Sequence, residues 1–103
     1  MKYIFEFYGG GQETEEGLRA GMQAMAQWYA RLGGALIDGG GPISEAARTV
    51  SPNGVVTNGA IGEKPHGYCI VKADSVATAV EMAKGCPLVK FGRSISVLEV
   101  FET

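Results

Sequence analysis

The stretch Gly67-Tyr68-Cys69-Ile70-Val71-Lys72-Ala73 carries the clearest strand signal in the chain. Its apolar run is nearly continuous, which is typical of a strand in the middle of a sheet. Asp74 or Ser75 follows as the N-cap of a helix predicted over 76–84. The chain therefore passes here from a central strand directly into a helix.

The N-terminal third has the same order of strand and helix. Aromatic and β-branched residues predict a strand over 2–8, with apolar residues on both of its faces. A helix is predicted over 14–32 because apolar residues recur there at steps of four and three. That stripe consists of Leu18, Met22, Met25, Tyr29 and Leu32. Gly17 and Gly21 lie close to the stripe, where close packing on a sheet would explain two residues that otherwise weaken a helix.

The remaining elements complete a known arrangement. A short strand over 35–37 leads into a Gly-rich loop, and a last strand covers 94–101. Strands over 48–51 and 55–58 flank a strong turn signal and predict a hairpin. Without this hairpin the order is strand-helix-strand-strand-helix-strand, the split βαβ arrangement. The predicted fold class is therefore α+β: a ferredoxin-like split βαβ with an extra β-hairpin, built on a four-stranded, mainly antiparallel sheet with two helices on one face.

Two helices cover only one face of such a sheet. The apolar residues on the other face, such as Ile4 and Tyr8, then need a partner. Face-to-face packing of two sheets in a symmetric homodimer would bury them. A monomer whose second face is partly covered by the Gly-rich segments is the competing interpretation.

The composition limits the classes of function. The 103 residues suit a single domain over 1–103. A net charge of -2 argues against nucleic acid and anionic membranes as partners. No apolar run approaches the ~20 residues of a membrane span, and the N-terminus lacks a signal-peptide pattern, so we expect a cytoplasmic protein. A lone histidine without a carboxylate cluster predicts that the protein binds no metal. The sequence has neither a phosphate-loop nor a dinucleotide-binding motif, so we expect no cofactor.

The candidate catalytic residues are Asp38 and His66. Asp38 opens the loop Asp38-Gly39-Gly40-Gly41-Pro42, where it would act as a general base or accept backbone N–H bonds in its own turn. His66 is the only histidine and would act as a proton shuttle or remain a solvated residue at a strand entrance. The two form an acid–base pair only if the fold brings them together.

The candidate ligand-binding residues come from three places in the chain. Trp28 lies off the centre of the helix stripe, which favours a pocket edge or a dimer rim. The glycines of the Asp38 loop let a ligand approach the backbone closely. Tyr68 and Arg93 face either the space between two sheets or solvent, and alternation alone does not decide between these. The full set is Trp28, Gly40, Gly41, Pro42, Tyr68 and Arg93.

A series of short motifs, taken in order, resembles a known family. The chain contains Met1-Lys2-Tyr3-Ile4-Phe5, Gly34-Ala35-Leu36, Gly40-Gly41-Pro42, Thr49-Val50, Val56-Thr57-Asn58-Gly59, Gly67-Tyr68-Cys69-Ile70-Val71, Ala73-Asp74-Ser75 and Ser96-Val97-Leu98-Glu99-Val100. Their order and spacing, over nearly the whole chain, resemble the YCII-related family in its DGPF-domain branch. The resemblance implies a ferredoxin-like protomer that dimerises as an α+β barrel.

The sequence departs from this family at two places. Of the DGPF signature, which falls on Asn58-Gly59-Ala60-Ile61, only Gly59 is retained. Some relatives have a proposed histidine–aspartate pair with the histidine on the first helix, but residues 14–32 contain no histidine here. The resemblance therefore transfers no catalytic residue to this chain.

Two functions of different classes follow. The first is a small homodimeric protein that binds a small organic ligand in a modest pocket. The second is a lyase or isomerase-like enzyme, similar to the dehydrochlorinase or muconolactone isomerase of this superfamily. Such an enzyme would act on a small aromatic-derived acid, with Asp38 or His66 moving a proton. A pure assembly module without a pocket is the third interpretation.

Overall fold

The computed structural model describes residues 1–9 and 14–101 of the chain. Its elements, in chain order, are β1 (Lys2–Tyr8), α1 (Glu15–Leu32), η1 (Gly33–Ala35), β2 (Leu36–Pro42), β3 (Arg48–Val50), β4 (Val56–Asn58), β5 (Gly67–Lys72), α2 (Val76–Lys84), α3 (Pro87–Lys90) and β6 (Ser94–Val100). The predicted strand over 2–8 and the predicted helix over 76–84 are confirmed at both of their ends.

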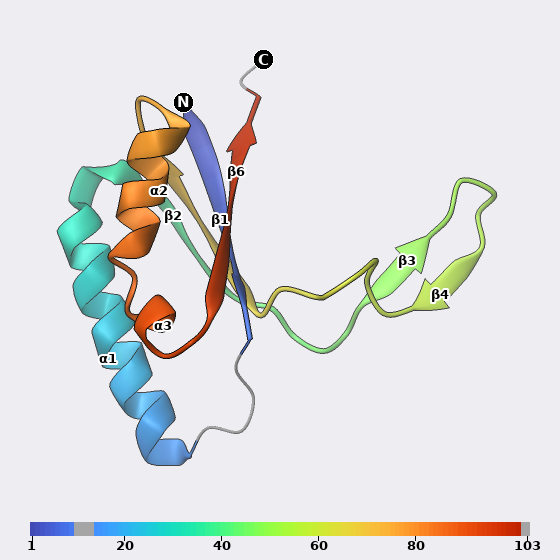
Figure 1. The fold of residues 1–103 in the computed structure, drawn as a ribbon. Helices are drawn as coiled ribbons and strands as arrows, with labels where there is room; N and C mark the ends of the chain where they lie inside the picture. Colours follow the sequence, from blue (N-terminus) through green and yellow to red (C-terminus); the bar gives the residue numbers. More distant parts are fainter. Residues whose placement is uncertain (10–13, 102–103) are drawn as a thin grey trace.

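The central sheet is four-stranded and antiparallel, with the order β2-β5-β1-β6. The predicted central position of β5 is confirmed, since it pairs with both β1 and β2. This strand order and the alternation with α1 and α2 are those of the ferredoxin-like split βαβ arrangement. The helices lie on one side of the sheet (Figure 1). The fold is therefore α+β and ferredoxin-like in character.

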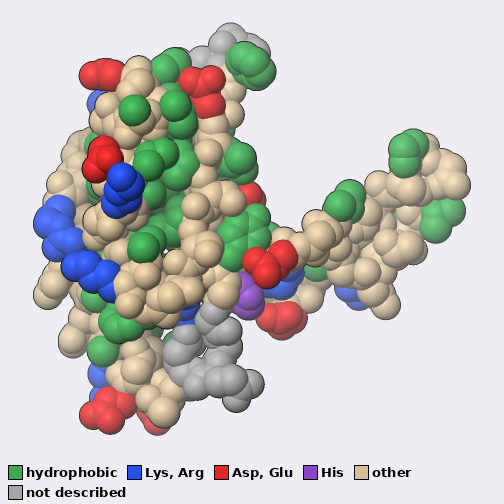
Figure 2. All heavy atoms as spheres, in the orientation of Figure 1, with side chains coloured by type: hydrophobic (Ala, Val, Ile, Leu, Met, Phe, Trp, Pro, Cys, Tyr) green, Lys and Arg blue, Asp and Glu red, His purple; other side chains and the backbone are tan. Residues whose placement is uncertain are grey.

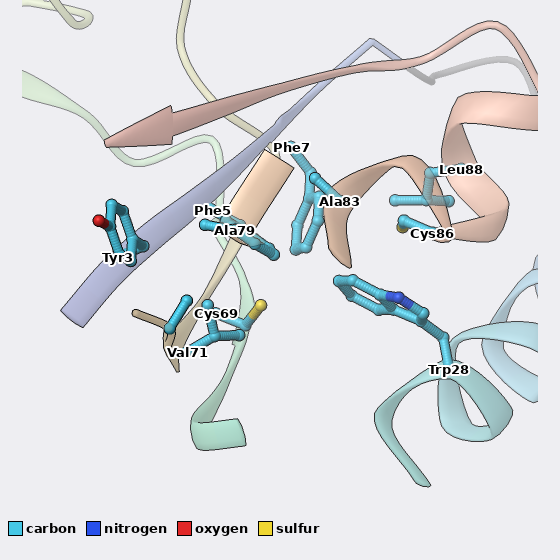
Figure 3. Packing of buried hydrophobic residues seen from close by; sticks show 11 residues of the cluster. Tyr3, Phe5, Phe7, Trp28, Cys69, Val71, Ala79, Ala83, Cys86 and Leu88 are labelled. Carbon is cyan, nitrogen blue, oxygen red and sulfur yellow. The ribbon is translucent and has the colours of Figure 1, made fainter. Parts of the chain in front are cut away.

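The hydrophobic core fills the layer between the sheet and the helices (Figure 3). Alternate residues of β1 point into it because successive side chains of a strand face opposite ways. Phe5 stacks on Trp28 of α1 with ring centroids 6.1 Å apart, and Phe7 meets the same indole edge-on at 6.3 Å. Ala79 of α2 is fully buried in the same cluster.

The buried side of α1 differs from the predicted stripe. Trp28 is only 2% exposed and its Nε1 donates a hydrogen bond to the Met82 carbonyl at 3.2 Å, whereas Met22 is 73% exposed. The N-terminal half of α1 extends past the end of the sheet, so its apolar residues have no strand to cover (Figure 1). The predicted place of Trp28 at the rim of a pocket or dimer is therefore wrong, because the indole lies in the core.

The structure has two local features that the sequence pattern does not predict, in β2 and after α2. β2 does not end at residue 37 but continues through the Gly-rich segment to Pro42, with register irregularities after Leu36 and after Asp38. The short helix α3 follows Cys86, and its first residue, Pro87, is a residue favoured at that position. The segment 38–42 is therefore an irregular edge strand and not a loop.

In the described part of the chain, no helix packs on the face of the sheet opposite α1 and α2 (Figure 1). We call it the open face. Register places on it the β1 residues Ile4, Glu6 and Tyr8, the β5 residues Tyr68 and Ile70, and the β6 residues Ser96, Leu98 and Val100. Its aliphatic residues gather towards one end, where Lys2 and Lys72 also lie, and Glu6 and Ser96 lie towards the other end.

The β3–β4 hairpin projects away from the sheet on the side of the open face (Figure 1). We call residues 46–62, which contain it, the arm. Because of the arm the chain has a radius of gyration of 15.0 Å and extents of 44 × 41 × 19 Å. A compact domain of this length would have a radius of gyration of about 13 Å. The molecule is therefore L-shaped, with the sheet as one limb and the arm as the other.

Candidate functional site

Asp38 lies in β2 opposite Ile70, at the irregular part of the pairing. Its Oδ1 accepts a hydrogen bond from the backbone N–H of Gly40 at 2.8 Å, which is the local turn bond typical of aspartate before glycine. The side chain is exposed. Its contacts are those of a structural residue that holds the shape of its own segment.

His66 lies immediately before β5, at the other end of the β2–β5 pairing. Its N–H donates to the Phe7 carbonyl at 2.7 Å and its carbonyl accepts from Ile43 N–H at 2.9 Å, while its ring is exposed. Asp38 is opposite Ile70, four residues beyond His66, which corresponds to roughly 13 Å along a strand. The fold therefore does not bring Asp38 and His66 together within one chain.

Gly40 is needed for packing within the sheet. Its φ is +61°, and a Cβ built there would lie 2.0 Å from the carbonyl oxygen of Tyr68. By contrast, a Cβ on Gly41 would meet nothing within 4 Å. Pro42 ends β2 opposite Gly67. The sequence predicts that a ligand lies close to the backbone of these glycines. At Gly40, the close neighbour in the structure is the backbone of β5.

Arg93 lines an open groove between α2, α3 and β6, with a volume of about 490 Å³. Apart from Ser94 and the two cations Lys84 and Arg93, the lining is aliphatic. The aliphatic residues are Val80, Ala83, Val89, Ile95 and Val97. The Lys84 ammonium lies 3.0 Å from the Glu81 carboxylate. This groove joins an apolar lining to two cationic side chains, of which Lys84 is paired with Glu81.

Tyr68 lies on the open face next to Glu6 of β1, which is hydrogen-bonded to Tyr8. Glu6 is opposite Tyr68 on one side and Ser96 on the other. The Tyr8 hydroxyl donates to Glu6 Oε1 at 3.3 Å, and burial together with the charge of Glu6 raises the pKa of Tyr8. Sequence reasoning missed Glu6, although it is the only charged residue between Lys2 and Tyr8.

Both cysteines lie in the core. Cys69 and Cys86 are fully buried and unpaired by a disulfide, and the Cys86 thiol lies 3.7 Å from the Met25 sulfur. Burial raises the pKa of Cys69 to about 12 and raises that of Cys86 as well. Because the thiolate is the reactive form, these thiols are inert near neutral pH.

Residues 1–9 and 14–101 contain no group of three or more His, Cys, Asp or Glu side chains that could hold a metal ion. Among the same residues, no helix is both long and apolar enough to cross a membrane. No protein-family model matches the sequence, and no curated protein matches it.

Proposed function

We propose that this protein is a homodimeric binding protein for a small organic acid. The observation that supports the ligand is the groove beside Arg93, whose volume of about 490 Å³ lies within the range of small-molecule sites. Its aliphatic lining would remove an apolar body from water. A guanidinium recognises a carboxylate with two parallel hydrogen bonds, so Arg93 is the expected anchor of the acid group.

Binding is favoured over catalysis because the candidate acid–base pair is separated. Asp38 and His66 lie roughly 13 Å apart along β5, far beyond hydrogen-bond reach of a shared proton or of one bridging water. Among the described residues that line the groove there is no histidine and no carboxylate, and its lysine is paired with Glu81. We therefore assign the groove a binding role.

The homodimer is supported by the open face. Leu98 is 45% exposed and Val100 is 40% exposed on a surface that no helix covers. Two such faces packed together would exclude water from both, at the ~10 Å separation usual for stacked sheets. We propose that they pack as in a dimeric α+β barrel. The ferredoxin-like strand order also supports the proposed membership of the YCII-related family.

The ligand proposal is tested with benzoate as the probe and neutral benzamide as its isostere. Titration followed by amide chemical shifts should move the signals of Val89, Ile95 and Val97 with benzoate and leave them in place with benzamide. Arg93→Gln should weaken benzoate binding roughly 10-fold or more, because a charged hydrogen-bonding partner is lost.

Lys90→Gln provides the matched control for this experiment. Lys90 is an exposed cation on α3, close in sequence to Arg93, and it does not line the groove. Its removal should leave benzoate affinity unchanged. Equal binding of benzamide, or benzoate shifts located outside the groove, would contradict the proposal.

The homodimer is tested by sedimentation velocity at micromolar concentration. Leu98→Glu should convert the dimer to a monomer, because it places a charge in a desolvated apolar contact. Leu18→Glu is the control, since Leu18 is equally exposed at 49% but lies on α1, away from the open face. A wild-type protein that sediments as a monomer would remove the basis of the proposal.

A further inference from the structure

The arm has few charges and exposes aliphatic side chains, which is unusual for a surface that faces water on all sides. Among its 17 residues, 46–62, only Arg48 is charged, whereas 19% of the whole chain is charged. Val50, Val55, Val56 and Ile61 are all exposed on it (Figure 2). Depletion of charge together with exposed aliphatic residues is the composition of an interface core.

The apolar residues of the arm are also gathered by its pairing. Val50 and Val56 are opposite each other in the β3–β4 register, so their side chains share one face of the hairpin. Each strand has only three residues. A two-stranded hairpin of this kind is marginally stable alone in water, and it gains stability when a third layer covers it.

The base of the arm is fixed to the sheet. The Lys64 ammonium, whose side chain is 18% exposed, donates to the carbonyls of Pro65 at 3.3 Å and Ile43 at 3.5 Å. The backbone of His66 bonds to both Ile43 and Phe7. The arm is therefore held at an angle to the open face, and the two surfaces form the limbs of the L (Figure 1).

A second copy of the chain suits this geometry better than a different protein. Each copy offers one apolar arm and one uncovered sheet face, so a two-fold pair would cover both surfaces of both copies. The charges agree with this pairing. The only charge of the arm is positive, and the carboxylate of Glu6 lies in the polar half of the open face, while Lys2 and Lys72 lie together at its other end.

We infer that the apolar halves of the two open faces pack together and that the arm of each copy lies across the polar half of the other's open face, beside Glu6, so that two arms clasp the dimer. This inference rests on the proposed homodimer and adds to it an exchanged element. The arm then contributes aliphatic surface to the neighbour and is itself ordered by that contact.

Excision of the arm provides the principal test. Gly59 N–H bonds to the Ala47 carbonyl at 2.9 Å, the geometry of residues i+3 and i of a β-turn, so Asn-Gly can replace residues 48–58. Sedimentation equilibrium should show a dimer dissociation constant raised at least roughly 100-fold, because several buried aliphatic side chains are lost. The near-UV circular dichroism of the buried Trp28 should be retained and reports that the core still folds.

Two valines of similar exposure distinguish an effect of the arm on dimer affinity from a general effect of adding a charge to the surface. Val56, 57% exposed on the arm, and Val76, 53% exposed on α2, are the same residue with nearly the same exposure. Val56→Glu should raise the dissociation constant roughly 10-fold or more, and Val76→Glu should not change it. Equal effects of the two substitutions, or none, would overturn the clasp.

The outcomes of these experiments also distinguish the two proposals. A wild-type monomer would overturn both, whereas a dimer that keeps its affinity without the arm would overturn the clasp alone. An arm that instead folds onto its own sheet is detected by mixing Val56→Cys chains with size-tagged Ser96→Cys chains and adding a short bismaleimide. The clasp predicts a linked pair of one tagged and one untagged chain, and the absence of that product would contradict it. The buried Cys69 and Cys86 do not compete for the reagent.

Discussion

At the scale of single residues, Gly40 sets the shape of β2. Its φ of +61° is a conformation that residues with a Cβ rarely adopt, and a Cβ there would collide with the Tyr68 carbonyl. Gly40→Ala should therefore lower the free energy of unfolding by about 2–4 kcal/mol, which combines backbone strain with overpacking. Urea denaturation followed by Trp28 fluorescence measures this loss.

Two other glycines serve as controls for Gly40. Gly62→Ala shares the positive φ, at +70°, but places its Cβ in open space, so it should lose only about 1 kcal/mol. Gly41→Ala has neither feature and should be close to neutral. If Gly40→Ala cost no more than Gly62→Ala, the close crossing of β2 and β5 would be wrong.

The buried thiol and phenol make the fold sensitive to alkali. Burial raises the pKa of Cys69 from 9.0 to about 12 and that of Tyr29 from 10.0 to about 12. Between pH 9 and about pH 12 the unfolded chain releases protons that the folded chain retains, so the free energy of unfolding falls as pH rises. Stability should be constant below about pH 9 and should decline from there towards pH 12, as urea denaturation at a series of pH values will measure.

Cys69→Ala isolates the contribution of the thiol. With this thiol removed, the alkaline decline should still begin near pH 9, because burial also raises the pKa of Cys86, but it should be less steep than in the wild type. The variant is also less stable at every pH. A decline as steep as that of the wild type would show that the burial of Cys69 does not contribute to it. The same burial predicts that the native protein resists thiol reagents at pH 8 until it is unfolded.

At the scale of elements, α1 is a helix of two different halves. Its C-terminal half packs Trp28 and Tyr29 into the core, and its N-terminal half extends past the sheet. Gly21 lies in the N-terminal half of α1, and a Cβ there would meet nothing within 4 Å. The expectation that close packing on the sheet explains Gly21 is therefore wrong.

This environment predicts that Gly21→Ala stabilises the protein. Alanine restricts the unfolded chain and fits the helix without a contact, so the free energy of unfolding should rise by about 0.5–1 kcal/mol. Gly17→Ala is the contrasting variant, because its Cβ would lie 3.2 Å from the Oγ1 of the capping Thr14 and should gain less. Denaturant midpoints of the two variants measure the difference. A loss of stability in Gly21→Ala would mean that this turn of α1 is covered.

β2 illustrates why the Gly-rich segment was interpreted as a loop. Four of its seven residues are glycine or proline, which depress strand propensity, and its pairing with β5 is irregular. The segment becomes a strand because β5 offers a row of backbone groups along its free edge. Sequence propensity describes the segment alone and contains no information about that neighbouring edge.

At the scale of the whole molecule, the L shape connects the two proposals. The sheet limb carries the helices and the proposed acid-binding groove on one side and the open face on the other. The arm leaves the sheet at the polar end of the open face and presents the valines of the hairpin. The proposed dimer therefore uses the side of the molecule that the groove does not, and benzoate should bind the arm-excised monomer with unchanged affinity. Calorimetric titration of that variant measures this independence.

The sequence by itself determined the identity and order of the main elements. Strand and helix periods are local properties, and Thr14, Ser75 and the glycines that end the helices mark the boundaries through contacts within a few residues. The split βαβ order, the buried β5 and the apolar second face of the sheet all follow from such local patterns. The candidate groove could not be predicted, because its lining combines residues of α2, α3 and β6.

The tertiary structure alone decided which residues meet. It placed Asp38 and His66 at opposite ends of one strand pair, moved Trp28 from an expected rim into the core, and directed the hairpin away from the sheet. Each of these outcomes depends on register, on the length of a helix relative to its sheet, or on the bonds at the base of the arm. These are relations between distant segments, and a pattern within one segment does not encode them.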